Sequence, residues 1–190
     1  MTRLSTADIE ALLGPAMRSA SAVEYLEVDG LDLTMTSLPG LRVNWLTGVG
    51  VILDGAVLDD VRISESNLEK ASLRGAVIDD SVLFDCKFSA ANFAGLESAR
   101  TYWSHCSFRQ ADLREVTFVD CRVEACHFEG AQLSGARFER CVLQQLDLTS
   151  IDSILDLLFG CRLEACRLRP DQAQELAAGA NVLVEQKTDL

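Results

Sequence analysis

Residues 106–145 read CSFRQ ADLRE VTFVD CRVEA CHFEG AQLSG ARFER CVLQQ, and residues 86–95 read CKFSA ANFAG. The pattern recurs every five residues. A large apolar residue, most often leucine or phenylalanine, fills a central position at numbers ending in 3 or 8, and a small residue fills the position two before it, which we call the corner position. A period of five matches neither the turn of an α-helix nor the alternation of a long β-strand.

The same register covers most of the chain. From Val51 to Leu168 the central position is apolar except at Ser98 and Ser153. The corner position is small or valine, and its exceptions are Leu96, Leu146, Ile151 and Asp156. Weaker copies continue upstream through Leu33, Leu38 and Val43, so we place the repeat at residues 21–170. Residues 1–20 then form an N-terminal cap, and residues 171–190 form a C-terminal helix and strand.

A coil with four sides of five residues explains this period. Residues two apart on an extended segment share a face, so the central and corner side chains both point inward. Stacked coils pair backbone with backbone, and each coil contacts only its neighbours. About seven and a half coils stacked at one strand spacing make a rod of roughly 36 Å.

The units ADLRE (111–115), ANFAG (91–95) and AQLSG (131–135) resemble those of the pentapeptide-repeat family. The resemblance implies an all-β fold, a right-handed quadrilateral β-helix, which we expect to carry short helical caps at its N- and C-terminal ends.

The chain has 7 cysteines, and all of them occupy the corner position. A shared column predicts that they pack as small apolar residues rather than bind metal or form disulfides. His105 and His127 fall at outward positions, with no serine or cysteine nucleophile evident beside them, and no phosphate-binding or zinc-protease motif is present. We therefore expect no enzyme activity and no cofactor. The irregular residues 96–103 indicate either a bulge or a loop that displays Tyr102 and Trp103.

The formal net charge is -12. Direct binding to nucleic acid needs clustered lysine and arginine, so we do not expect it. Acidity serves either solubility or occupation of a site meant for nucleic acid. No apolar run approaches the roughly 20 residues that span a bilayer, and the N-terminus lacks a signal-peptide pattern, so we expect no membrane association and a cytoplasmic location.

Outward carboxylates stack from coil to coil and predict an acidic strip. Its expected members are Asp59, Asp60, Asp79, Asp80, Asp120 and Glu139, with Glu65 and Asp85 on the adjoining side. B-DNA as long as the rod would carry about 21 negative charges, and arginines offset many of the carboxylates here, so the strip is far less charged than DNA.

Both ends of a solenoid need caps. Residues 5–13 predict a short helix that ends at Gly14-Pro15, and residues 171–179 predict a second helix that Gly179 ends. Apolar residues near the C-terminus predict a homodimer through that end. The residues expected to form it are Ile154, Leu155, Leu157, Leu176, Val182, Leu183 and Val184.

Repeats followed by a small C-terminal helix and strand resemble the Qnr and MfpA group of the family. That resemblance implies a dimeric rod that imitates DNA, binds a type II topoisomerase (DNA gyrase or topoisomerase IV) and protects it from quinolones, an antibiotic-resistance role. The alternative is a scaffold for another protein partner. A continuous acidic face would favour the first hypothesis, and interspersed arginines would favour the second.

Overall fold

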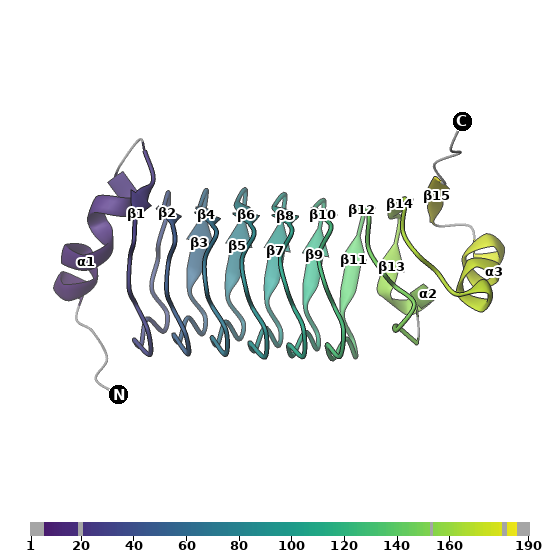
Figure 1. The fold of residues 1–190 in the computed structure, drawn as a ribbon, viewed down its shortest axis with the longest axis horizontal. Helices are drawn as coiled ribbons and strands as arrows, with labels where there is room; N and C mark the ends of the chain where they lie inside the picture. Colours follow the sequence, from purple (N-terminus) through teal and green to yellow (C-terminus); the bar gives the residue numbers. More distant parts are fainter. Residues whose placement is uncertain (1–5, 19–20, 153, 180–181, 186–190) are drawn as a thin grey trace.

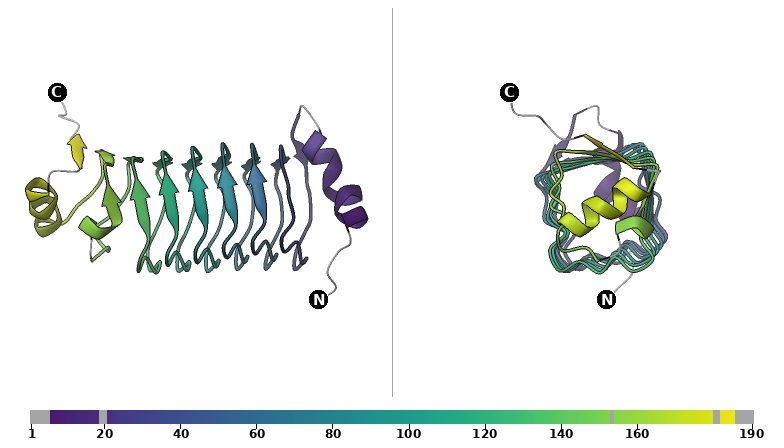
Figure 2. Two further views of the ribbon diagram at one scale, coloured as in Figure 1. Left: turned by 180° about the vertical axis from the view of Figure 1, so that it is seen from behind. Right: turned by 90° about the vertical axis from the view of Figure 1, so that its right-hand side faces the viewer.

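A computed structural model of the chain shows a rod built from square coils, with a helix at each end (Figures 1 and 2). The structure describes residues 6–18, 21–152, 154–179 and 182–185. Corresponding positions of successive coils are 20 residues apart, as in the hydrogen bond between the Leu46 amide and the Ser66 hydroxyl. The predicted quadrilateral β-helix with helical caps is confirmed. None of its described helices is long and apolar enough to cross a membrane.

Two of the four faces are parallel β-sheets. The nine-stranded face has the order β1 (Val23–Glu24), β2 (Arg42–Asn44), β4 (Arg62–Ser64), β6 (Val82–Phe84), β8 (Tyr102–Ser104), β10 (Arg122–Glu124), β12 (Val142–Gln144), β14 (Arg162–Glu164) and β15 (Leu183–Glu185). The six-stranded face has the order β13 (Leu158–Phe159), β11 (Arg137–Glu139), β9 (Thr117–Val119), β7 (Glu97–Ala99), β5 (Val77–Asp79) and β3 (Val57–Asp59).

The other two faces are joined by single parallel bridges between coils. The first bridge face follows the nine-stranded face along the chain and includes the pair Lys87 and Ser107. The second bridge face comes next and includes the pair Asn92 and Asp112. A coil therefore runs from the nine-stranded face through the two bridge faces to the six-stranded face.

The central residues fill the rod. Phe88, Phe93, Phe108 and Phe118 are all buried, and corresponding phenylalanines of successive coils stack on one another. The rings of Phe88 and Phe108 lie 5.5 Å apart at an interplanar angle of 8°. Aromatic pairs of this kind stabilise the fold by more than the burial of their apolar area alone. The phenylalanines at the central position therefore pack the core, as their place in the repeat predicts.

Corners of the coil are of two kinds. On entering the second bridge face and the six-stranded face, the corner amide bonds within its own turn, as Ala71 does to the Leu68 carbonyl at 3.2 Å. On entering the other two faces, the corner amide bonds to a side chain of the next coil, as Val61 does to the Ser81 hydroxyl at 3.0 Å. All of the cysteines lie at corners of the second kind. They are free thiols, and all but the half-buried Cys166 are buried.

Residues 96–103 keep the regular coil, so both expectations for them, a bulge and a projecting loop, are wrong. Trp103 is fully buried in the core. Its indole donates a hydrogen bond to the hydroxyl of Ser98, 3.1 Å away. Ser98 occupies a central position, which most repeats fill with an apolar side chain. The large indole and the small serine compensate for each other's volume, and the hydrogen bond satisfies both buried polar groups.

Helix α1 (Thr6–Arg18) covers the first coil and is longer than predicted, because Gly14 and Pro15 lie inside it. Leu13 and Ala16 are buried against the core on one side of this helix. Burial of that apolar side continues past the proline and outweighs the lost backbone hydrogen bond. Gly14-Pro15 therefore does not end the helix.

Helix α3 (Pro170–Ala178) lies across the other end of the square, and Gly179 follows it as predicted (Figure 2). Gln172 is fully buried, and its amide nitrogen donates to the carbonyls of Leu148, at 2.9 Å, and Ile151, at 2.6 Å. A further coil would have paired with the Ile151 carbonyl, as the Gln132 amide pairs with the Ala111 carbonyl at 2.9 Å. The cap thus supplies the hydrogen bond that another coil would have supplied there.

Candidate functional site

The acidic strip lies where the six-stranded face turns into the nine-stranded face. Asp59 and Asp79 end the neighbouring strands β3 and β5 and are paired in register. Asp60 and Asp80 follow them at the corner in the left-handed backbone conformation, with φ of 50° and 47°. Aspartate tolerates this conformation better than most residues, so the turn itself favours carboxylates here.

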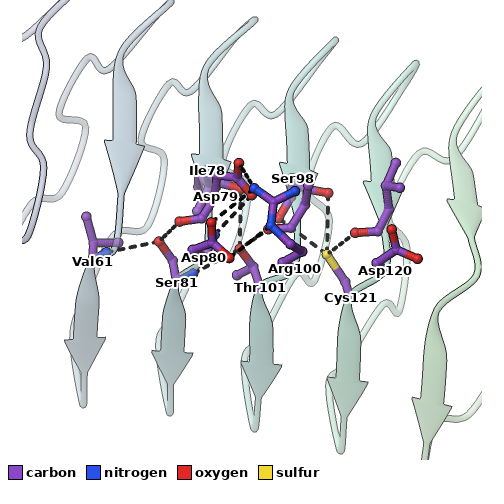
Figure 3. Close-up of polar contacts among 12 residues, drawn as sticks. Val61, Ile78, Asp79, Asp80, Ser81, Ser98, Arg100, Thr101, Asp120 and Cys121 are labelled. Carbon is purple, nitrogen blue, oxygen red and sulfur yellow. Dashed lines mark hydrogen bonds and ion pairs between the residues drawn. The ribbon is translucent and has the colours of Figure 1, made fainter.

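Arginines interrupt the strip. Arg100 is the residue one coil after Asp80, and its Nε lies 2.9 Å from the Asp80 carboxylate while its Nη2 also contacts Asp79 (Figure 3). The hydrogen bond from Arg100 lowers the pKa of Asp80 below its ordinary value. The two aspartates therefore share one guanidinium, and the negative potential of the strip falls at β7.

The same alternation continues toward the C-terminus. Arg140 holds Asp120 through Nε at 2.9 Å and lies 3.8 Å from Glu139. At the N-terminal end, Arg42 reaches across the corner to Asp60 at 2.7 Å. The expected strip is therefore interrupted by ion pairs. Within it, carboxylates of neighbouring coils stack without an arginine between them at Asp59 and Asp79 and at Asp60 and Asp80.

Glu65 and Asp85 lie on the adjoining edge, between the nine-stranded and first bridge faces. Glu65 accepts a hydrogen bond from the indole of Trp45 at 3.0 Å. The Trp45 ring stacks on Tyr25 with centroids 5.0 Å apart. His105 occupies the next corner after Asp85, so this edge carries two acidic residues between aromatic ones. It is separate from the strip that Asp59 begins.

Three exposed residues that do not belong to the predicted strip lie on the same face. Val57 and Val77 are exposed apolar residues at the start of β3 and β5, beside Asp59 and Asp79. Glu97 occupies the matching place on β7 and is exposed. Their signal in the sequence is an apolar side chain at a position just before the central residue, where most repeats carry a polar one.

His105 does have a serine neighbour, contrary to the expectation from the sequence. The hydroxyl of Ser104 lies 2.8 Å from Nδ1 of His105. Ser104 is 1% exposed, because it lies between neighbouring strands of the nine-stranded face. A substrate could not reach its oxygen, and nucleophilic attack needs such access. Within the described residues, no group of His, Cys, Asp and Glu could hold a metal ion.

The apolar residues assigned to a dimer contact divide into two sets. Ile154 and Leu157 belong to the short helix α2 (Ile154–Leu157) and are buried in the core, as is Leu176 of α3. They are not surface residues, because α2 turns them inward. Leu155, Leu183 and Val184 are exposed, Val182 is half-buried, and Phe159 adds a further exposed ring.

Comparison with known proteins supports the repeat assignment. Two family models, both described as pentapeptide repeats, match residues 99–144 (9 copies) and residues 49–80 (8 copies). No curated protein matches the chain.

Solved structures with the same fold include QnrB1, a plasmid-mediated fluoroquinolone resistance protein. Full-length QnrB1 matches with a TM-score of 0.72 and 18% identity over 88% of this chain and 84% of QnrB1. A trypsin-treated variant of QnrB1 gives 0.55 and 18% identity over 90% and 93% of the two chains. HetL, involved in heterocyst differentiation regulation in the cyanobacterium Nostoc sp. strain PCC 7120, gives 0.45 and 13% identity over 96% and 95%.

The two matched segments share one five-residue register, which runs through the square coils. The pairing of β11 with β13 shows that the register is the same before and after α2. The chain is a pentapeptide-repeat protein whose β-helix resembles that of QnrB1.

Proposed function

We propose that this protein is a non-catalytic rod that binds another protein through the edge formed by Asp59, Asp60, Asp79 and Asp80. The observation that carries the proposal is the placement of these carboxylates. Asp59 and Asp79 end the paired strands β3 and β5, Asp60 and Asp80 follow them directly, and the exposed Val57 and Val77 lie on the same strands. Charged groups around an apolar patch are typical of protein interfaces, where charge guides encounter and apolar burial stabilises the complex.

The partner that fits this edge has a basic surface with some acidic groups. The four aspartates outnumber the two arginines paired with them, Arg42 and Arg100, so this edge attracts lysine and arginine. Further along the rod, Arg140 pairs with Asp120, and charges of the two signs alternate. This alternation favours a protein partner over a site that holds duplex DNA, whose phosphates present one sign of charge. It also gives specificity, because a uniformly basic surface would find its main attraction at the four aspartates.

Binding can be tested by changing the four aspartates together to asparagine. A matched control removes as many charges elsewhere, with Glu69, Glu115 and Glu129 changed to Gln and Asp147 to Asn. Crosslinked partners captured from host lysate by the wild-type protein should be lost with the aspartate variant and kept with the control. Equal capture by both variants would sink the proposal.

A second candidate is that the partner is a type II topoisomerase, with the acidic edge in its DNA-binding groove. The supporting observation is the similarity of the whole rod to QnrB1, described as a fluoroquinolone resistance protein. Addition of the purified protein to a gyrase supercoiling assay, with and without a quinolone, tests it. Unchanged supercoiling and unchanged inhibitor sensitivity at micromolar protein would exclude this partner and leave other partners open.

We further propose a homodimer through the C-terminal end. β15 is the outermost strand of the nine-stranded face, and Leu183 and Val184 on it are 69% and 44% exposed. Pairing of this end with a second copy would bury these side chains and close the sheet edge. The expected mass in light scattering is twice that of the chain, and Leu155→Asp with Leu183→Asp should give a monomer. A wild-type monomer at 100 μM would contradict the dimer.

A further inference from the structure

Among the described residues, the hydrogen-bond ladder of the bridge faces breaks between residues 128–135 and the coil that follows. In regular coils the amides of the bridge faces donate to the next coil, as Phe108 does to His127 at 2.8 Å and Leu113 does to Gln132 at 2.8 Å. One coil later, the corresponding amides have no acceptor among the described residues. These amides belong to Phe128, Gly130, Leu133 and Gly135. The coils pair again at β11 and β13, through Phe138 and Leu158.

The core is open at the same place. Ala131 and Leu133 are partly exposed, whereas Ala111 and Leu113, one coil earlier, are fully buried. A cleft of about 850 Å³ separates this edge from the following coil, whose wall includes Ile151 and Leu157. The cleft therefore has an apolar floor and, along one lip, backbone groups of a strand edge.

The sequence explains why the coils part here. Leu146 and Ile151 are the largest corner residues of this coil, and Asp156 stands at a corner where a strand would bury its carboxylate. Burial of an unpaired carboxylate is costly. The chain instead forms the short helix α2 (Figure 1). This helix exposes Asp156 and buries Ile154.

We propose that this cleft binds an extended peptide segment of a partner protein as an added strand. On each of the two bridge faces a pair of amides two residues apart lacks an acceptor among the described residues, Phe128 with Gly130 and Leu133 with Gly135, and this is the spacing at which an extended chain presents its carbonyls. A small ligand would satisfy one or two of them. The volume lies within the range of ligand pockets, and the partly exposed Ala131 and Leu133 offer apolar contact to alternate side chains of the segment.

The rim specifies the charge of the segment. Asp152 and Asp156 are exposed on the α2 side of the cleft, and they outnumber Arg137, the one basic residue of the described lining. A lysine or arginine beside the apolar residues of the segment would complement them. The cleft shares no residue with the acidic edge at β3 and β5, so the two binding proposals are tested independently.

A fluorescein-labelled peptide, Lys-Val-Thr-Val-Thr-Val-Lys, serves as the probe in an anisotropy titration against the full chain. We expect saturable binding in the micromolar range. The same peptide with alternate backbone nitrogens methylated keeps the apolar side chains and the carbonyls, but its methyl groups block close approach of its backbone to the strand edge. It should bind at least tenfold more weakly.

A grafted variant closes the cleft. Residues 151–157 take the sequence of residues 111–117, ADLREVT, which restores small corner residues in the same register. In the wild-type protein we expect the amides of Leu133 and Gly135 to exchange faster than those of Leu113 and Glu115, and in the graft their hydrogen exchange, measured by NMR, should slow. The graft should also lose the peptide by at least tenfold.

Three results would each overturn the proposal. They are wild-type exchange at Leu133 as slow as at Leu113, no saturable peptide binding to the wild-type protein up to 1 mM, and equal binding to the wild type and to a graft whose exchange shows that the ladder has closed. If the graft fails to fold, the first two measurements still decide.

Discussion

At corners of the second kind, small polar side chains accept hydrogen bonds from backbone amides of the preceding coil. The hydroxyl of Ser66 lies 2.9 Å from the amide of Leu46, and the amide of Cys86 bonds in the same way to the Cys106 thiol. The thiol of Cys106 also reaches the Leu83 carbonyl at 3.5 Å. Serine, threonine and cysteine are small residues that can do this, and alanine cannot. This role explains why the cysteines avoid the corners where the turn satisfies its own amide.

Substitution of Cys106 tests this role. Cys106→Ala leaves the buried amide of Cys86 without an acceptor, which typically costs about 1–3 kcal/mol. Cys106→Ser keeps an acceptor and should be less destabilised than Cys106→Ala in urea unfolding. Greater stability of the alanine variant would show that the thiol acts only through its volume.

The ion pairs of the strip predict a pH dependence. Hydrogen bonding to Arg140 lowers the pKa of Asp120 below the ordinary value of about 3.9. A folded-state pKa below the unfolded one adds stability that is present above the unfolded pKa and is lost as pH falls through the folded pKa. In Arg140→Gln, an NMR titration should show the pKa of Asp120 rising toward its ordinary value. Asp171, whose pKa is lowered by Arg169, should not change.

At the scale of elements, stacked coils depend on their shared core. The Phe118 ring stacks on Phe138 with centroids 4.7 Å apart and meets Trp103 edge-on at 5.9 Å. Phe118→Ala opens a cavity among three coils and should cost about 3–5 kcal/mol in chemical denaturation. Phe84→Ala, at a ring 42% exposed on the nine-stranded face, is the control and should cost far less. A loss below 1 kcal/mol for Phe118→Ala would contradict its central packing role.

The cap at α3 depends on Gln172. Its side chain accepts a hydrogen bond from the Arg169 amide at 2.7 Å and donates to two carbonyls of the last coil. Gln172→Ala leaves these buried backbone groups without the hydrogen bonds of the side chain, so it should lower the free energy of unfolding by about 1–3 kcal/mol. Gln174→Ala, on the exposed side of α3, should change it by less than about 0.5 kcal/mol. Equal midpoints for the two variants would argue against the cap.

Elements were predictable from the sequence where the repeat is regular. The corner and central columns suffice to place β3 to β12, because a period of five leaves one consistent inward set. The α1 boundary was not, since Pro15 is a local signal and burial of Ala16 is a tertiary one. Ser153 and Asp156 depart from the repeat, which indicates an irregularity at this place. Periodicity does not predict that the irregularity is a helix that buries Ile154 and Leu157.

At the scale of the whole molecule, the acidic strip illustrates what one sequence leaves undetermined. The coil period places Asp59 beside Asp79 and Asp80 before Arg100, and both placements hold. Whether Arg100 turns toward the aspartates or into solvent depends on its rotamer, which periodicity does not encode. The reach of Arg42 around the corner to Asp60 joins two faces that the repeat treats separately.

The two kinds of corner also set the units in which this protein can change length. Loss of five residues would keep the period but rotate every later repeat by one face. Alanines would then meet amides that need an acceptor, and cysteines would enter turns that need none. Loss of 20 residues, the spacing that joins Leu46 to Ser66, returns each corner to its own kind. Although the sequence repeats in fives, insertions and deletions should be tolerated in whole coils.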